Sequence, residues 1–130
     1  MLREVWKLLP YPEVDWGEDQ LWADMALKAG FQKGYAHDAT VYHSHADNDV
    51  MLLKKAIDEG DFWARYWGIQ LVQDEEEAIK AANARDLIFA RQNAIAESIT
   101  AARLHANEIL VRGRYQGWLN ARDTEQILRH

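Results

Sequence analysis

The 130-residue chain has no cysteine and only two prolines. The lack of cysteine excludes a disulfide scaffold and a thiolate metal site, and it fits a reducing, cytoplasmic location. No apolar run reaches the roughly 18 residues that a membrane-spanning helix needs. Seven glycines and two prolines also exclude a collagen-like or linker sequence. With 48% hydrophobic and 28% charged residues, the composition predicts one globular domain or a piece of a larger protein.

Acidic and basic residues are distributed unevenly along the chain. Residues 1–78 carry seven Lys and Arg against 16 Asp and Glu, whereas residues 79–130 carry eight against five. The acidic front part would repel phosphates, so a nucleic-acid partner is not expected. The mildly basic tail suits peripheral contact with an anionic membrane surface, which would be the inner face of the membrane for a cytoplasmic protein.

The first 46 residues read as short, mixed elements. Asp15 and Glu18 have the spacing of a capping box, and apolar residues at three-four spacing predict a helix that ends before a left-handed Gly30. Residues 33–36 and 39–43 read as two short extended segments. One helix and two short strands are too little to build a sheet with a buried face, which indicates that this part is incomplete on its own.

From Asp49 onward the pattern is helical. Asp49 is expected to cap a helix over residues 50–59, Gly60 to break it, and Asp61 to cap a second helix. That second helix carries an aromatic cluster at helical spacing, which is typical of a core: Phe62, Trp63, Tyr66 and Trp67.

A long helix follows. Asp74 is placed as its cap, and an apolar stripe continues over residues 74–111. Gly113 is expected to end this helix, residues 114–118 to form a turn, and Asp123 to cap a final short helix.

Two carboxylates at the start of the first predicted helix are the main candidates for chemistry. Glu18 and Asp19 have a structural interpretation, because acids in a first turn are stabilised by the helix dipole. They also have a functional one, in which the helix start holds a carboxylate ionised and ready to take a proton from a hydroxyl. Trp16 and Trp22 flank the pair, and an aromatic surface beside a carboxylate suits a sugar ring.

His43 and His45 lie two residues apart on an extended segment, so their rings point to the same side. They are a candidate chelating pair for a divalent metal. The alternative interpretation is a strand end with two ordinary surface histidines. Two nitrogens do not make a metal site, so a further ligand would have to come from elsewhere.

Three stretches in this order resemble the C-terminal half of family 2 glycosyltransferases, and within them the rhamnosyltransferase-type enzymes of bacterial surface polysaccharide synthesis. The resemblance covers residues 12–60, whereas the helical remainder is similar only loosely. The stretches are Glu18-Asp19-Gln20-Leu21-Trp22, Ala29-Gly30-Phe31 and Ala39-Thr40-Val41-Tyr42-His43-Ser44-His45.

This resemblance implies an α/β fold of the A type that transfers a sugar from a nucleotide-diphosphate donor to an acceptor hydroxyl of a growing glycan. It implies Asp19 as the general base, Glu18 as a supporting acceptor contact and Trp22 as part of the acceptor site. It also implies that His43 lies near the diphosphate and a divalent metal, Mg or Mn, in the complete enzyme.

The sequence departs from that family at the donor side. The Asp-x-Asp metal motif of the family is absent from its expected place, since the one such triplet, Asp47-Asn48-Asp49, follows the last predicted strand. We therefore expect an α/β fragment with residues 1–48 as part of a catalytic domain and residues 49–130 as a helical extension. Alone, this chain is expected to be inactive and to bind neither donor nor metal tightly.

An alternative function is a non-catalytic helical interaction module. In that interpretation residues 74–111 form a coiled-coil-like arm through which the chain makes a homo-oligomer. The apolar positions drift between spacings of three and four instead of holding strict heptads, and few of them are leucine, so this alternative ranks second.

Overall fold

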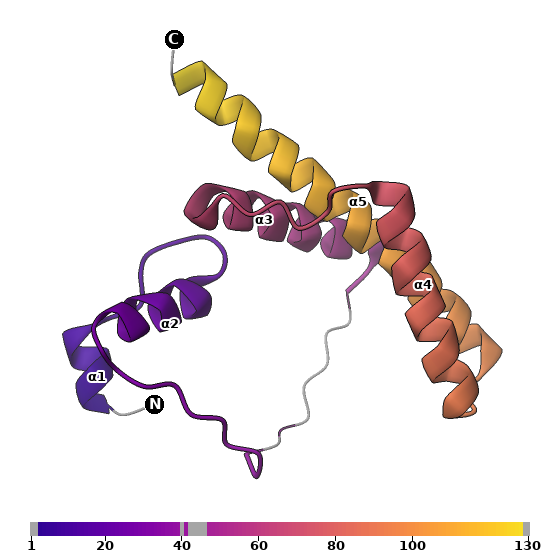
Figure 1. Cartoon of the computed structure of the whole chain (residues 1–130), viewed down its shortest axis with the longest axis horizontal. Coiled ribbons are helices and arrows are strands. Elements are labelled where there is room, and N and C mark those ends of the chain that lie inside the picture. Colours follow the sequence, from indigo (N-terminus) through magenta and orange to yellow (C-terminus); the bar gives the residue numbers. More distant parts are fainter. Residues whose placement is uncertain (1–2, 40, 42–46, 129–130) are drawn as a thin grey trace. The chain divides into compact units, whose positions relative to one another are not determined.

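The computed structural model describes residues 3–39, 41 and 47–128, with side chains up to Thr124. The chain divides into two compact units, residues 1–45 and 46–130, which we describe separately. The described residues hold five helices and no strand (Figure 1). None of these helices is long and apolar enough to cross a membrane.

The expected α/β fragment is therefore wrong. Residues 33–36 run without regular structure, and the N–H of Ala39 closes a turn onto the carbonyl of Ala36 at 3.2 Å. The other expected strand, residues 39–43, falls mostly outside the described residues. A strand is held by backbone hydrogen bonds to a neighbour, and the described part of the chain offers residues 33–36 no such neighbour.

The first unit contains α1 (Arg3–Leu8) and α2 (Glu18–Lys28). Helix α2 begins after Gly17, which has a left-handed backbone with φ of 73° and makes no side-chain cap, so the predicted capping box at Asp15 is wrong. The left-handed Gly30 is confirmed, with φ of 88°. A glycine adopts this conformation without the steric cost of a Cβ.

The segment between α1 and α2 is held against α2 by Trp22. The indole Nε1–H of Trp22 donates to the carbonyl of Leu9 at 2.5 Å. The Trp22 ring also lies 5.5 Å from the ring of Tyr11, centroid to centroid, at an interplanar angle of 46°. One side chain thus fixes the path of the chain from α1 to α2.

The second unit begins with α3 (Asp49–Trp67), whose cap is Asn48 and not the predicted Asp49: the side chain of Asn48 accepts a hydrogen bond from the N–H of Met51 at 2.9 Å. Helix α3 runs through Gly60 without interruption, so the predicted break there and the predicted cap at Asp61 are wrong. Asp61 instead pairs with Arg65 one turn later, at 2.6 Å.

The predicted long helix is two helices, α4 (Glu75–Gln92) and α5 (Glu97–Leu128). The cap at Asp74 is confirmed, since its carboxylate accepts from the N–H of Glu77 at 2.9 Å. Between the helices the chain reverses through Ala94, which has a left-handed φ of 50°. The hairpin packs α4 against α5 and buries Asn107 of α5 where it contacts Asn83 of α4, a contact that a single straight helix cannot make.

Contacts between α4 and α5 confirm the antiparallel pairing. Arg103 donates to the carboxylate of Asp86 at 2.8 Å, and the buried Asn107 donates to the side-chain oxygen of Asn83 at 3.1 Å. As the residue number rises on α5 it falls on α4, and the two helices lie side by side (Figure 1).

Helix α5 packs against α3 in the parallel sense. Asp49 pairs with His105 at 2.8 Å near the start of α3, and Arg65 contacts Thr124 at 3.3 Å near its end. Because both numbers rise together, the helices run in the same direction. Helix α5 therefore packs against α4 along its first part and against α3 along its later part.

Small residues let α3 and α5 approach closely. Gly113 and Gly117 lie inside α5 and face α3, whereas the sequence predicted a helix end at Gly113, a turn after it and a new cap at Asp123. A Cβ added to Gly117 would overlap the carbonyl oxygen of Ile57, and one added to Gly60 would overlap the carbonyl oxygen of Arg114. Residues four apart share one helix face, so these glycines form a continuous seam.

Candidate functional site

The two predicted catalytic carboxylates lie together in the first turn of α2. Glu18 and Asp19 are both exposed. The carboxylate of Asp19 accepts a hydrogen bond from the N–H of Gln20 at 2.8 Å. The free N–H groups and the positive dipole end of a helix start favour a negative charge at this place.

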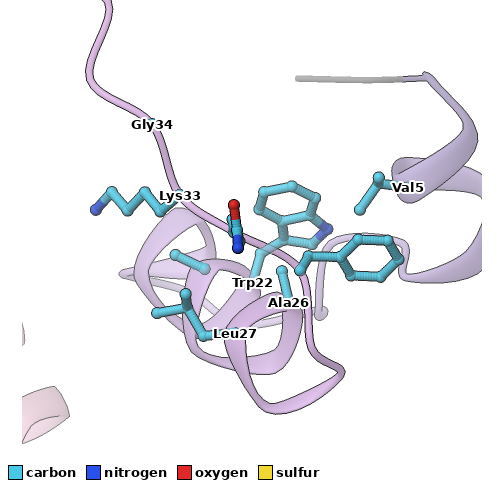
Figure 2. A pocket seen from close by; sticks show the side chains of 9 residues that line it. Val5, Trp22, Ala26, Leu27, Lys33 and Gly34 are labelled. Atoms are coloured by element: carbon cyan, nitrogen blue, oxygen red, sulfur yellow. The ribbon is translucent and has the colours of Figure 1, made fainter.

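An apolar cavity of about 540 Å³ lies beside α2 (Figure 2). Helix α1 contributes Val5, and the segment after α2 contributes residues 31–34. Helix α2 contributes four side chains, those of Trp22, Ala23, Ala26 and Leu27. Figure 2 shows the side chain of Lys33 extending away from Trp22 and Val5, so the ammonium group does not enter the cavity.

Asp19 lies on the cavity side of α2. It precedes Trp22, Ala23 and Ala26 by three, four and seven residues, and residues at these spacings share one face of a helix. Because helical side chains tilt toward the N-terminus, the lining side chains lean toward the turn that carries Asp19. A carboxylate thus stands one turn from the cavity wall.

The end of α2 shapes the other side of the cavity. The N–H of Gly30 donates to the carbonyl of Leu27 and the N–H of Phe31 to that of Ala26, both at 3.0 Å. This is the Schellman pattern, which brings the residue after the glycine into apolar contact with the last turn of the helix. Phe31 and Ala26 accordingly both line the cavity.

The predicted site residues differ in where they lie relative to α2 and the cavity. Glu18, Asp19 and Trp22 lie on α2, with Trp22 in the cavity wall. Trp16 precedes α2, is half-buried and is not part of that wall. His43 and His45 lie outside the described residues, so their prediction as metal ligands stays a prediction.

Sequence reasoning missed Phe31 and Val5 as cavity residues. The sequence Ala29-Gly30-Phe31 held a signal for the first, because a Schellman end predicts that an apolar residue after the glycine folds back on the helix. No comparable signal marks Val5, whose position depends on how α1 packs.

Among the residues that the structure describes, no group of three or more His, Asp or Glu side chains is arranged to hold a metal ion. The described carboxylates of α2 therefore do not form a metal centre by themselves.

The strongest electrostatic cluster of the second unit joins α4 to α5. The pKa of Asp86 is lowered from 3.8 to about 2, chiefly by the hydrogen bond from Asn107 and then by that from Arg103. The pKa of His105 is raised by its hydrogen bond to Asp49 at the α3 seam. Both clusters link helices and border no cavity described in this chain, so we assign them to the fold.

Comparisons of the chain with protein-family models, with curated proteins and with solved structures find no match. The resemblance to family 2 glycosyltransferases therefore stands on the quoted residues alone.

Proposed function

We propose that the first unit is the acceptor side of a glycosyltransferase that moves a sugar from a nucleotide-diphosphate donor to an acceptor hydroxyl of a glycan. The observation that carries this proposal is the position of Asp19, an exposed carboxylate at a helix start and on the face of α2 that borders the cavity. A general base must be both ionised and accessible to the proton that it takes.

In this proposal Asp19 accepts the proton of the acceptor hydroxyl. The oxygen then forms the new bond to the anomeric carbon of the donor sugar, and the bond from that carbon to the diphosphate breaks, so the nucleoside diphosphate leaves with the electron pair. Glu18, on the neighbouring position of the same turn, accepts a second hydrogen bond from the acceptor. Trp22 offers its ring as an apolar surface to the acceptor.

Donor binding is assigned to residues other than those that the structure describes, in a donor-binding part that works together with this unit. A divalent metal, Mg or Mn, would neutralise the charge of a leaving diphosphate when it is bound. The described residues form no group of three or more ligands for it, so we assign this metal to the donor-binding part.

Replacing Asp19 with Asn tests the proposal, because Asn keeps the shape of the side chain and removes the basic oxygen. In the enzyme assembled with its donor-binding part, release of nucleoside diphosphate from a panel of nucleotide-diphosphate sugars should fall by about 100-fold or more. The matched control is Asp15→Asn, which makes the same chemical change ahead of α2. Near-normal turnover of Asp19→Asn would overturn the assignment.

A second candidate is self-association through the α4–α5 hairpin. In place of the single helix predicted over residues 74–111, the structure has the two helices α4 and α5. The closed end of this hairpin leaves large apolar side chains exposed: Ile88 is 56% exposed, Phe89 60% and Ile99 63%. Apolar side chains grouped on a surface favour association. Sedimentation of the full chain should show an oligomer that Phe89→Glu dissociates, and a monomer at all concentrations would exclude this candidate.

A further inference from the structure

The cavity beside α2 has the size of a small-molecule site. Its volume of about 540 Å³ falls in the range of roughly 300–1,000 Å³ that ligand pockets occupy. A helix with its side chains is about 10 Å across and does not fit into such a space. The occupant is therefore a small molecule or one group of a larger molecule.

The walls of the cavity offer few hydrogen-bonding partners. Trp22 already donates its only side-chain hydrogen to the carbonyl of Leu9, so it presents carbon atoms alone to the cavity. Val5, Ala23, Ala26, Leu27 and Phe31 add apolar surface. Gln32 is the one lining side chain with an uncharged polar group, and the Lys33 ammonium extends outward.

This lining selects against a bare sugar. A monosaccharide carries several hydroxyls, and each one buried without a partner costs free energy. An aliphatic or aromatic group has no such cost and gains free energy from burial in proportion to its apolar area. We infer that the cavity binds the apolar part of an amphipathic ligand and leaves its polar part at the end of α2 that carries Asp19.

The direction of the ligand follows from α2. The apolar residues Trp22, Ala23 and Ala26 lie progressively farther from the helix start, whereas the carboxylate of Asp19 stands at that start. A ligand whose apolar end lies against these three residues places its hydroxyl-bearing end one turn nearer the base. That this ligand is the glycosyl acceptor rests on the proposed function, whereas its binding to the cavity does not.

Binding of octyl β-glucoside, below its micelle concentration, compared with free glucose tests the inference on the full chain. The readout is the methyl NMR signals of Val5, Ala26 and Leu27, which need no transferase activity. Octyl β-glucoside should shift these signals saturably, and glucose should not. Equal shifts with glucose, or none with octyl β-glucoside, would overturn the inference.

Variants show whether the cavity itself is the site. Ala23→Leu places a larger side chain in the cavity and should raise the dissociation constant for octyl β-glucoside about tenfold or more. A difference of one methylene group in an apolar pocket already has an effect of this size. Ala29→Leu makes the same change at an exposed position outside the lining and should leave binding unchanged. Equal affinity in both variants would contradict the assignment.

A second pair of variants tests the same assignment if Ala23→Leu does not fold. Leu27→Gln puts a polar group into the wall at a residue that is 51% exposed and should weaken binding, whereas Leu8→Gln on α1, outside the lining, should not. Equal effects of these two changes would also contradict the inference. The octyl β-glucoside experiment needs no transferase activity and the turnover assay of Asp19→Asn needs no alkyl ligand, so a failure of catalysis and a failure of the cavity assignment are separately observable.

Discussion

The two units of this protein differ in how they bury apolar surface. The second unit holds a connected set of buried residues along α5, including Asn107, Val111 and Ala121, which α3 and α4 cover. In the first unit, Ala26 is the only buried hydrophobic residue among those described, and α2 borders an open cavity. A seam of glycines and paired polar groups holds the helices of the second unit together, whereas α2 of the first unit presents its apolar face to the open cavity.

Hydrogen exchange provides the largest test of this contrast. Amides in the middle of α5 lie in a helix that packs against α3 and α4, whereas residues 33–39 lie outside any helix. Exchange should therefore be at least about 100-fold slower in α5 than in residues 33–39. Strong protection of residues 33–39 in a monomer would mean that this segment has found strand partners and would break the comparison.

The glycine seam predicts the next largest effect. Gly117→Ala should destabilise the second unit by about 1–3 kcal/mol, because its Cβ overlaps the Ile57 carbonyl, although alanine is the better helix former by about 1 kcal/mol. The control is Gly34→Ala in the first unit, where an added Cβ meets nothing within 4 Å. Denaturant unfolding followed by circular dichroism measures both, and equal stability of the two variants would show that the seam is loose.

Asp86 predicts an acid-dependent loss of stability in the second unit. Its pKa is about 2 in the folded chain and 3.8 as the ordinary value, so the stabilisation is present above about pH 4 and lost as the pH falls toward 2. Asp86→Asn should flatten the stability profile over that interval. Because Asn107 is the main cause of the shift, Asn107→Leu should flatten it more than Arg103→Gln; the reverse order would contradict this explanation.

We expect the smallest effect on stability from the ion pair between His105 and Asp49, since both side chains are exposed. The pKa of His105 is raised above 6.5 in the folded chain, so its stabilisation is complete below that value and is lost as the pH rises through the folded pKa. His105→Gln should remove this decline from thermal unfolding measured across neutral pH, with α4 unaffected. A decline that persists in the variant would have to arise from another group.

The sequence predicted local features of the fold better than long-range ones. The cap at Asp74 and the left-handed Gly30 were predicted correctly, because each depends on hydrogen bonds within a few residues. Gly60 and Gly113 were interpreted as helix breakers, since an isolated glycine weakens a helix. They lie within helices because contact with another helix favours a residue without a Cβ.

In the candidate site, too, the local features could be predicted from the sequence and the long-range ones could not. Glu18, Asp19 and Trp22 could be selected from their spacing at a helix start. Their relation to a cavity could not, because the cavity also needs Val5 from α1 and the fold-back of the chain after α2.

By itself, the sequence determined that helices follow Asp49, that α2 has an acidic first turn, and where α2 ends, since propensities and caps act over a few residues. Only the tertiary structure decided that the stretch over residues 74–111 folds back as α4 and α5, that α3 lies parallel to α5, and that the glycines form their seam. These outcomes depend on which apolar faces bury each other, and burial is a property of contacts between segments distant in the sequence.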